Sequence, residues 1–415
     1  TISDLHKAIE IKKRIAQGKV SRAVVIGGGA IGIEMAEAFT DLWGVDATLL
    51  EPQPQLRPPL VDHHFATMLK QHLLDKGVAV YTGESAEVLI EGGQGQVVAV
   101  RTGKRLLDAD LVVMAVGVRP RSELAREAGL DVASFGGIKV NQRLQTSDAN
   151  IYAAGDCIAV THLLTGKDTY TPLGSLANRE GRIVADNMAG QPALFKGVLG
   201  SFIMKAFERC IASTGLTLEA ARVEGFDADC ALTAPADRAH FFPDQAVVIL
   251  QLVFDRRSRR VLGLQAFGMM NDSISARVDA AAALIAKGGT IEDFGLLEMA
   301  YAPPFSSAID SINAAAYVAE NLCDDRLRQV ELARFLQWME DMDSEPDWAV
   351  LDLRHPVEAA PYVDKFGAER WTALEYGQVR ARHGELSPDK TYILMCNAGP
   401  RSYEVQVFLD HLGTV

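Results

Sequence analysis

The sequence predicts an α/β protein with more than one domain, and three observations lead to this prediction. First, the 415 residues exceed the usual size of a single hydrophobic core. Second, residues 21–51 read as a strand, a glycine-rich turn, a helix and a second strand, which is the order of a parallel βαβ unit. Third, short apolar runs of strand type alternate with patterns of helical spacing along most of the remaining chain.

The composition indicates a globular protein and excludes several classes of partner. Apolar residues make up 48% of the chain, and the formal net charge is -13. Because no basic run or basic face is visible, we expect no nucleic-acid partner and no anionic-membrane partner. No apolar run approaches the ~18–20 residues that span a bilayer, and the first residues lack the apolar core of a signal peptide, so we expect a cytoplasmic protein.

The cysteines of the chain do not follow a disulfide or zinc pattern. They are odd in number and scattered, whereas structural zinc sites use closely spaced pairs. We therefore expect no metal. The five are Cys157, Cys210, Cys230, Cys323 and Cys396.

The first βαβ unit carries a Gly-x-Gly-x-x-Gly pattern. Gly27, Gly29 and Gly32 directly follow the apolar run 24–26. Gly27 permits a tight turn, Gly29 lets the backbone approach a pyrophosphate, and Gly32 lets the helix pack close to the strand. The helix N-terminus then presents free N–H groups to the phosphates. The glycines either bind a dinucleotide or only form a turn, and the complete βαβ context favours dinucleotide binding.

An acidic residue, Glu51, ends the second strand of this unit. At ~20 residues past the glycines, its carboxylate is placed to accept a hydrogen bond from a ribose 2′-hydroxyl, and its charge repels a 2′-phosphate. The sequence therefore favours NADH over NADPH, although Arg57 leaves room for NADPH.

The elements after Glu51 can be placed coarsely. We expect a helix over 62–76 and a short helix after Pro120. An apolar strand is expected to end in the Ala-Gly-Asp sequence at 154–156, and a later helix to begin near Leu176, with Gly181 allowing close packing. Short strands are expected at 78–83, 86–92, 95–102 and 109–117.

From residue 200 onward the pattern changes. Apolar runs of strand type and an Ala-rich stretch at 275–289 predict a separate α+β domain with antiparallel strands. A charged segment with helical spacing then leads to a small α/β unit, in which the strand 391–395 is followed by the loop 396–402 and a final helix.

Motifs along almost the whole chain resemble those of the FAD-dependent pyridine nucleotide-disulfide oxidoreductases. Within that family they resemble the coenzyme A-disulfide reductase and NADH-dependent persulfide or polysulfide reductase branch, which carries a C-terminal rhodanese domain. The resemblance implies a Rossmann-like NAD domain inserted in a split FAD domain, then an α+β dimerisation domain and a small α/β rhodanese-like domain. The motifs are VVIGGGAIGIEMAEAF, AVGVRP, TSDANIYAAGDC, LANREGRIVADNM and YAPPFSSAIDSINAAAYVAEN.

The resemblance also implies domain boundaries. They are a lead-in over 1–20, an NAD-binding domain over 21–117, the C-terminal part of the FAD-binding domain over 118–198, the dimerisation domain over 199–322, a linker over 323–345 and an incomplete rhodanese-like domain over 346–415. In relatives the first flavin fingerprint and the redox cysteine precede the NAD domain. We therefore expect that the sequence is part of a longer protein; the alternative is a variant that has lost the flavin half-site.

The same motifs imply the residues of the flavin site. Asp156 is expected to hydrogen-bond the ribityl hydroxyls of FAD, with a helix leading from it toward the isoalloxazine; the alternative for Asp156 is a helix N-cap. Cys157 is expected to be a packed residue rather than a redox centre. Five further residues are assigned to cofactor binding, namely Ile31, Glu34, Gly117, Gly155 and Asn178.

Tyr301 matches a tyrosine that the family brings from the partner subunit to the disulfide site, where it acts as an acid for the leaving thiolate. The alternative is a tyrosine that anchors a Pro turn at a dimer interface. Phe242 stands where relatives have a second tyrosine, which weakens the specific assignment of coenzyme A disulfide as the substrate.

Cys396 opens a loop that resembles the Cys-x-x-Gly-x-Arg loop of rhodaneses. Backbone N–H groups and a helix N-terminus around the sulfur lower the thiolate pKa, and Arg401 is expected to hold a negatively charged donor. Pro400 is unexpected in such a loop because it lacks an N–H group. Asp352 and Arg354 match the family's first strand. The alternative is a buried structural cysteine.

These residues together predict an NADH-dependent flavoprotein reductase of disulfide, persulfide or polysulfide sulfur. The expected cofactors are FAD and NADH, with CoA as a further candidate, and the expected partners are a small-molecule substrate and a second copy of the chain. Hydride would pass from NADH to FAD and then to a redox cysteine outside this sequence, while Cys396 carries sulfane sulfur. The alternatives are a flavin NADH oxidase and a non-catalytic nucleotide-binding or sulfur-carrier module.

Overall fold

The computed structural model describes residues 4–57, 60–93, 95–239, 241–270 and 274–413. The chain divides into two compact units, which are described one after the other. The first comprises Thr1–Ala228 with Leu262–Gly289, and the second comprises Asp229–Val261 with Thr290–Val415.

The first unit contains a parallel four-stranded sheet. Its strand order is β3-β2-β1-β7. From β1 the chain adds β2 and then β3 on one side, and it later adds β7 on the other side of β1, so the strand order reverses at β1. Ligands of open α/β sheets bind at such a reversal, outside the carboxyl ends of the strands. The strands are β1 (Arg22–Ile26), β2 (Asp46–Glu51), β3 (Ala79–Thr82) and β7 (Leu111–Met114).

Helices and a small antiparallel sheet accompany the parallel sheet. The predicted helix over 62–76 and the four predicted strands are confirmed. The helices are α1 (Leu5–Ala16), α2 (Ala30–Glu37), extended by the π-helix η1 (Ala38–Leu42), and α3 (His63–Asp75). The antiparallel sheet consists of β4 (Ala86–Glu91), β5 (Val97–Thr102) and β6 (Leu106–Asp108).

The next part of the first unit has little regular structure apart from one long helix. The predicted strand before Ala154 is wrong, because a strand needs a bonded neighbour and Tyr152 only forms an isolated bridge with Gln145. The long helix begins at Gly174, which confirms the helix predicted to begin near Leu176. The elements are α4 (Glu123–Glu127), β8 (Ile138–Lys139), β9 (Ile158–Thr161), β10 (Asp168–Thr169) and α5 (Gly174–Met188).

The predicted packing role of Gly181 is also wrong. A Cβ atom on Gly181 would meet no atom of the described residues within 4 Å, so none of them packs closely against this helical glycine. The first unit ends with antiparallel strands, as predicted, and two helices. They are β11 (Phe202–Ala206), β12 (Arg209–Gly215), β15 (Val261–Met269), α6 (Leu218–Val223) and α7 (Ile274–Ile285).

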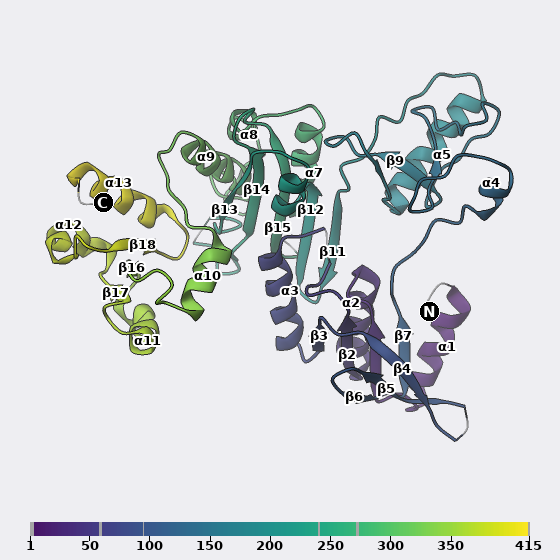
Figure 1. Ribbon diagram of the computed structural model, residues 1–415, viewed down its shortest axis with the longest axis horizontal. Coiled ribbons are helices and arrows are strands. Elements are labelled where there is room, and N and C mark those ends of the chain that lie inside the picture. The colour runs from purple at the N-terminus through teal and green to yellow at the C-terminus, as the bar shows by residue number, and fades with distance from the viewer. Residues whose placement is uncertain (1–3, 58–59, 94, 240, 271–273, 414–415) are drawn as a thin grey trace. The chain divides into compact units, whose positions relative to one another are not determined.

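The second unit ends in a parallel three-stranded sheet of order β17-β16-β18. The helix α10 (Leu332–Glu340; Figure 1) lies within the predicted linker 323–345. Its Trp338 packs in a core with Val350 and Trp371, so this segment contributes to the fold. The strands are β13 (Ala228–Thr233), β14 (Ile249–Asp255), β16 (Trp348–Asp352), β17 (Trp371–Ala373) and β18 (Thr391–Met395).

The helices of the second unit fall into two groups by length. The longer ones are α9 (Ser311–Cys323), α10 (Leu332–Glu340), α11 (Pro356–Phe366) and α13 (Pro400–Leu412). The shorter ones are α8 (Ile291–Gly295), η2 (Tyr376–Gln378), α12 (Val379–Arg382) and η3 (His383–Glu385).

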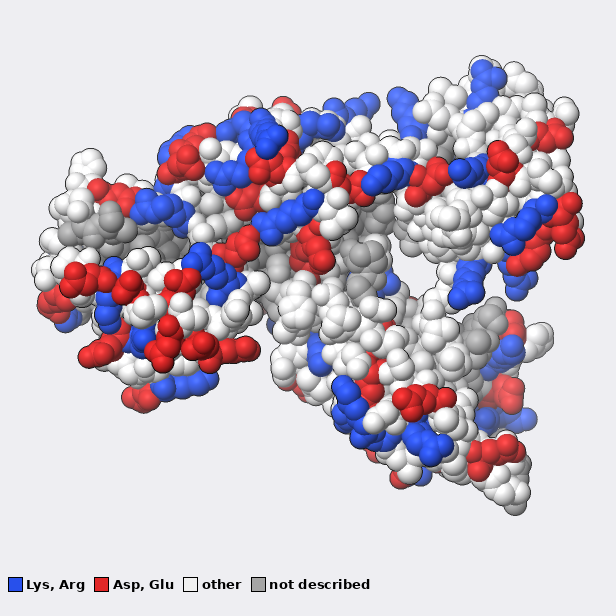
Figure 2. Space-filling view, viewed as in Figure 1, with Lys and Arg blue, Asp and Glu red and all other residues white. Residues whose placement is uncertain are grey.

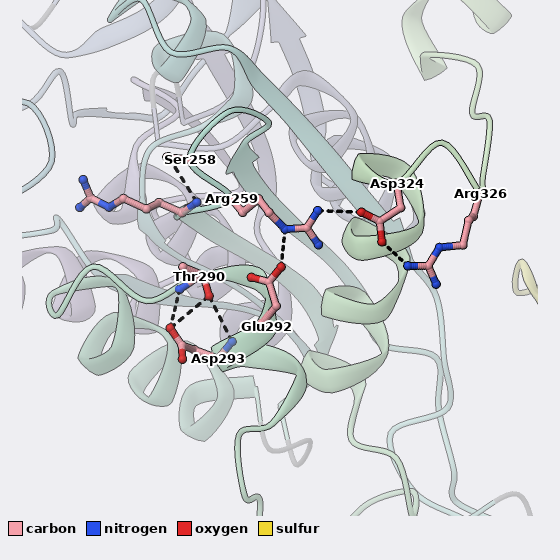
Figure 3. A network of polar contacts seen from close by, with 8 residues as sticks. Ser258, Arg259, Thr290, Glu292, Asp293, Asp324 and Arg326 are labelled. Atoms are coloured by element: carbon pink, nitrogen blue, oxygen red, sulfur yellow. Dashed lines mark hydrogen bonds and ion pairs between the residues drawn. The ribbon is translucent and has the colours of Figure 1, made fainter.

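A network of polar contacts holds the segment between α9 and α10 (Figure 3). Arg259 bonds Asp324 through an N–H group at 2.8 Å and also pairs with Glu292. Further along, Arg328 pairs with Asp410 of α13, and the Gln406 side-chain carbonyl accepts the Arg328 backbone N–H at 3.0 Å. The segment is therefore bound on both sides.

The surface carries charges of both signs. Lys and Arg side chains are interspersed with Asp and Glu over the face seen in Figure 2. The formal net charge of the whole sequence is -13. In the described part of the chain, no helix has both the length and the apolar character needed to cross a bilayer.

Candidate functional site

The glycine turn at the end of β1 has the predicted steric character. Gly27 has φ +112°, and a Cβ atom there would lie 2.2 Å from the carbonyl oxygen of Ala115. A Cβ on Gly32 would lie 1.9 Å from the carbonyl oxygen of Gly27. Both positions therefore exclude any side chain. Gly117 follows β7, which pairs with β1 beside this turn.

The N-terminus of α2 is open toward an anion. Gly29 is its N-cap and makes no side-chain cap hydrogen bond, and a Cβ on Gly29 would meet only Arg57 Nη1, at 4.0 Å. The first N–H groups of a helix have no intrahelical partner and lie at the positive end of the dipole. These features fit a dinucleotide pyrophosphate. Ile31 and Glu34 are exposed on the same helix.

The Glu51 side chain hydrogen-bonds the backbone of this turn. Its carboxylate accepts hydrogen bonds from the backbone N–H of Gly28 at 2.7 Å and of Gln53 at 2.8 Å. The side chain is buried, with 8% of the residue exposed. One acceptor position on each oxygen is thus already used by the backbone. The contact of Glu51 with a ribose stays a prediction.

The Gly155–Asp156 turn is the candidate flavin contact. Asp156 is exposed, and its backbone carbonyl accepts the Tyr170 hydroxyl at 3.1 Å. Glu180 of α5 accepts the Gly155 N–H at 2.8 Å and so holds the turn. An exposed carboxylate on a turn that is fixed by a hydrogen bond can accept hydrogen bonds from hydroxyl groups. These residues therefore fit the ribityl part of a flavin.

The expected helix after Asp156 is wrong. Cys157 is followed by β9, because Ile158 pairs with Ile138 of β8 in a buried cluster. The N-cap alternative for Asp156 fails for the same reason. The helix near this turn is α5, where Asn178 is exposed and donates to the Gly174 carbonyl at 2.8 Å.

Two groups with a raised pKa lie beside Asp156. Burial, reinforced by the charge of Asp156, raises the pKa of Glu180, against the hydrogen bond from Gly155. Burial also raises the pKa of Cys157, whose thiol donates to the Ala154 carbonyl at 3.3 Å. A cysteine that packs in its thiol form is suited to a structural role.

The loop after β18 surrounds the sulfur of Cys396 with donors. The Gly399 N–H donates to the sulfur at 3.1 Å. Burial is the largest influence and raises the pKa of Cys396, yet hydrogen bonds from the Ser402 hydroxyl and from the N–H groups of Ser402, Ala398 and Gly399 lower it below its ordinary value. Hydrogen-bond donors thus surround the sulfur, and the binding of an anion in this loop stays a prediction. The sequence analysis missed Ser402, although it lies in the same loop.

Pro400 is compatible with this loop, contrary to the sequence-based expectation. Helix α13 begins at Pro400, not after Ser402, and Gly399 at φ +100° is its N-cap. Proline is well suited to the first helical position, where its missing N–H would have no intrahelical partner.

Charged side chains rim the cysteine loop. The Arg401 guanidinium is exposed and lies 5.8 Å from the centre of the Tyr376 ring. Glu404 accepts the Tyr376 hydroxyl at 2.5 Å and pairs with Arg380 at 3.1 Å. The role of Arg401 toward a donor stays a prediction, and Arg380 is a cation that the sequence analysis missed.

Asp352, which is buried, and Arg354, which is partly buried, form an ion pair at the end of β16. Arg354 donates two side-chain hydrogen bonds to the Asp352 carboxylate, at 2.9 and 2.6 Å, and Trp371 Nε1 donates a third at 3.0 Å. Burial works against ionisation of Asp352, but these hydrogen bonds hold its pKa below the ordinary value. The pair fixes the end of the central strand.

Tyr301 is 52% exposed and lies in the second unit. Phe242 stacks obliquely on Phe241 with ring centres 5.0 Å apart. Neither the acid role of Tyr301 nor its alternative as an interface anchor is decided by these contacts. In the described residues, no group of three or more His, Cys, Asp or Glu side chains could hold a metal ion.

Comparison with known families matches most of the chain. Residues 2–181 match the model described as pyridine nucleotide-disulphide oxidoreductase, and residues 204–312 match the dimerisation domain of the same family.

Individual proteins show the same likeness. The NAD(P)H coenzyme A polysulfide/persulfide reductase of Pyrococcus horikoshii is 35% identical over 311 residues, which are 75% of this chain and 68% of that protein. An NADH oxidase of Methanocaldococcus jannaschii is 34% identical over 306 residues, 74% of this chain and 67% of that protein. The solved structure of an NAD-dependent persulfide reductase from A. fulgidus has a TM-score of 0.90 and 33% identity, and the match covers 100% of this chain and 73% of that one.

Proposed function

Because the chain belongs to the pyridine nucleotide-disulphide oxidoreductase family, whose members use FAD and NAD(P)H, we propose that this oxidoreductase reduces persulfide, polysulfide or coenzyme A-linked disulfide sulfur. The observation that carries the proposal is the Cys396 cradle, which accompanies a dinucleotide turn in the same chain. The name of the Pyrococcus horikoshii relative supports the same substrate class.

The cradle suits sulfur transfer. The Cys396 thiolate attacks the outer sulfur of a donor, a bond forms between the two sulfurs, and the donor leaves with the electron pair of the broken bond. The N–H groups around Cys396 stabilise negative charge on the sulfur before and after transfer. Arg401, exposed beside the loop, attracts an anionic donor.

The reductive part of the reaction consumes NAD(P)H. A persulfide, one NADH and one proton give a thiol, hydrogen sulfide and NAD⁺. Bound FAD supplies the electron transfer between nicotinamide and sulfur. The glycine turn holds the dinucleotide phosphates, and Asp156, fixed by the bond between Gly155 and Glu180, accepts from the flavin hydroxyls.

The active protein is proposed to be a homodimer. The matched dimerisation domain exposes large apolar side chains, which soluble monomers rarely gather in one segment. In such a dimer Tyr301 would face the partner's disulfide site. The exposed residues of this segment are Leu296, Tyr301, Phe305 and Ile309, and Phe241 is exposed elsewhere in the same domain.

The test measures NADH consumption and sulfide release by the flavin-loaded protein with coenzyme A persulfide. We expect sulfide and oxidised NADH in equal amounts. Cys396→Ala should abolish sulfur transfer from a thiosulfate or polysulfide donor, whereas Cys323→Ala, at a half-buried cysteine at the end of α9, should leave it unchanged. Sulfur transfer that survives Cys396→Ala would exclude the cradle from the reaction.

A second candidate is a flavin NADH oxidase, because the Methanocaldococcus jannaschii relative has that name. It predicts oxygen uptake that follows NADH oxidation without any sulfur compound. An oxygen electrode distinguishes the two reactions, and binding of NADH without either turnover would identify a non-catalytic module.

A further inference from the structure

The helix that follows the cysteine loop carries an acidic side chain near its beginning. Helix α13 begins at Pro400, and the hydroxyl and N–H groups of Ser402 bond the Cys396 sulfur. Glu404 lies two residues further along the same helix and is exposed. A carboxylate beside a loop that is proposed to receive an anionic donor repels that donor, unless a neighbouring cation offsets its charge.

Glu404 binds two side chains of the segment 376–380. Its carboxylate accepts the Tyr376 hydroxyl at 2.5 Å and pairs with Arg380 at 3.1 Å. These two hydrogen bonds, the one from Tyr376 first, hold the pKa of Glu404 below its ordinary value, so the group is ionised at neutral pH. The Arg380 guanidinium also lies 4.9 Å from the centre of the Phe408 ring, one turn further along α13. Arg380 is therefore held along this helix, and Glu404 offsets its charge.

Arg401 is the cation beside the loop whose charge is not offset in this way. It stands between Gly399 and Ser402, which both donate to the Cys396 sulfur. Its guanidinium lies 5.8 Å from the centre of the Tyr376 ring, and no carboxylate of the described residues pairs with it. Arg380, Arg401 and Glu404 thus carry a net charge of one positive unit, which is that of Arg401.

A further carboxylate lies on the residue that pairs with the loop just after the cysteine. Glu358 of α11 accepts the side-chain N–H of Asn397 at 3.2 Å and is exposed. Its negative charge adds to that of Glu404. The surroundings of Cys396 therefore favour an anion only weakly, and a donor with more negative charge meets more repulsion.

We propose that Glu404 is a specificity-determining residue of the sulfur-transfer loop, which selects a sulfane donor with one negative charge over a donor with two. The proposal rests on the proposed function, since it assumes that Cys396 accepts sulfane sulfur. Because Glu404 offsets Arg380, the loop offers the donor one uncompensated guanidinium, that of Arg401. A second negative charge on the donor finds no cation to pair with and is repelled by Glu404.

Two donors of similar size separate these charges. Methanethiosulfonate carries one negative charge, and thiosulfate carries two at neutral pH. In both, the Cys396 thiolate attacks the outer sulfur, a bond forms between these two sulfurs, and the sulfur–sulfur bond of the donor breaks. The electron pair of the broken bond leaves with methanesulfinate or with sulfite, and Cys396 becomes a persulfide. The step at the cysteine is the same for both donors.

The experiment measures two ratios. The first is kcat/KM with thiosulfate divided by kcat/KM with methanethiosulfonate. The second is the rate of Cys396 alkylation by the anion iodoacetate divided by the rate with neutral iodoacetamide, in which a change of thiolate pKa cancels. Glu404→Gln removes a negative charge and releases Arg380, so both ratios should rise roughly two- to fivefold, the size of an exposed ion-pair effect. The rise should shrink at high salt.

A second substitution shows that charge is the cause. Arg380→Gln leaves Glu404 without its cation and should lower both ratios, and Glu404→Gln combined with Arg380→Gln should return them to wild-type values, because both charges are gone. If Glu404→Gln does not fold, Arg380→Gln decides alone, and ratios that stay unchanged or rise in it overturn the proposal.

The matched control is Asp343→Asn, which removes a carboxylate that pairs with Arg370 at 2.9 Å. Arg370 directly precedes β17 and Cys396 directly follows β18, so they lie at opposite edges of this parallel sheet. Both ratios should keep their wild-type values in this variant.

Two results with folded Glu404→Gln would overturn the proposal. They are an alkylation ratio that stays unchanged or falls, and a donor ratio that stays unchanged while both donors react. If neither donor transfers sulfur to the wild type, the proposed function fails, and the alkylation ratio still decides whether Glu404 sets the charge preference at Cys396.

Discussion

The glycine turn after β1 and the cysteine loop after β18 have the same local structure but differ in what lies at the helix N-terminus. Each follows a parallel strand and leads into the N-terminus of a helix, and each depends on a glycine at its N-cap. At Gly29 no side chain caps the helix and a Cβ atom would meet only Arg57 Nη1, at 4.0 Å, whereas the Gly399 N–H donates to the protein's own Cys396 sulfur. A loop of this kind can thus leave its helix N-terminus uncapped or place it beside a side chain of the protein.

The largest expected effect is the loss of the first loop. Gly27→Ala places a Cβ atom 2.2 Å from the Ala115 carbonyl oxygen at a positive φ, and should cost about 2–5 kcal/mol of unfolding free energy together with NADH binding. Chemical denaturation and calorimetry measure the two losses.

Gly181→Ala provides the control for this change. The α5 helix leaves open space at that position, so the substitution should stabilise the protein by about 0.5–1 kcal/mol through helix propensity. A Gly27→Ala protein as stable as Gly181→Ala would show that the clash is relieved by small movements of the turn.

The second effect concerns the cysteine loop. Ser402→Ala removes the first of the hydrogen bonds that lower the pKa of Cys396, so that pKa should rise. Less thiolate is then present at neutral pH, and alkylation of Cys396 by iodoacetamide should slow and its pH profile should move upward. Cys323, whose pKa is raised by burial, is an internal reference that should keep its rate. An unshifted profile would assign the cradle to backbone N–H groups alone.

The smallest effect concerns a third turn, at Gly155 and Asp156, which is held by the Glu180 side chain and not by a helix N-terminus. The folded pKa of Glu180 is raised, so the folded state binds more protons than the unfolded state, and stability falls as pH rises from the unfolded pKa through the folded pKa. Glu180→Gln stays neutral and should remove this slope, so its Tm should exceed that of the wild type by an amount that grows as pH rises from the unfolded to the folded pKa and is constant above it. Parallel curves of Tm against pH would contradict it.

Glu180→Ala, by contrast, removes the acceptor of the Gly155 N–H. We expect faster hydrogen exchange at Gly155 and faster loss of flavin in Glu180→Ala than in Glu180→Gln, because the glutamine carbonyl can still accept. Equal exchange rates in the two variants would mean that the turn holds its shape without Glu180.

The elements that the sequence predicted well are those with a local steric or periodic cause. The clash at Gly32 and the helix α3 follow from neighbouring residues alone. The strand before Ala154 could not be judged in the same way, because an apolar run becomes a strand only when another segment bonds to it. The helix expected after Asp156 failed because the pairing of Ile158 with Ile138 is a contact distant in sequence.

In the candidate sites too, contacts between residues near in sequence could be predicted and contacts between distant residues could not. Spacing identified Cys396 and its loop, since all the donors lie within six residues of the sulfur. Spacing did not place Glu180 against Gly155, 25 residues earlier, or Arg57 against Gly29 and Phe202. Such contacts arise from packing between elements, for which a single sequence carries no direct signal.

The segment between α9 and α10, bound by Arg259 on one side and by Gln406 and Asp410 on the other, has a consequence for limited digestion. Proteases need an extended stretch of several residues that can leave the surface, and this segment can leave only when its ion pairs and hydrogen bonds break together. Although it is charged and lies at a predicted domain boundary, trypsin should cleave at Arg326 and Arg328 no faster than the surrounding fold opens.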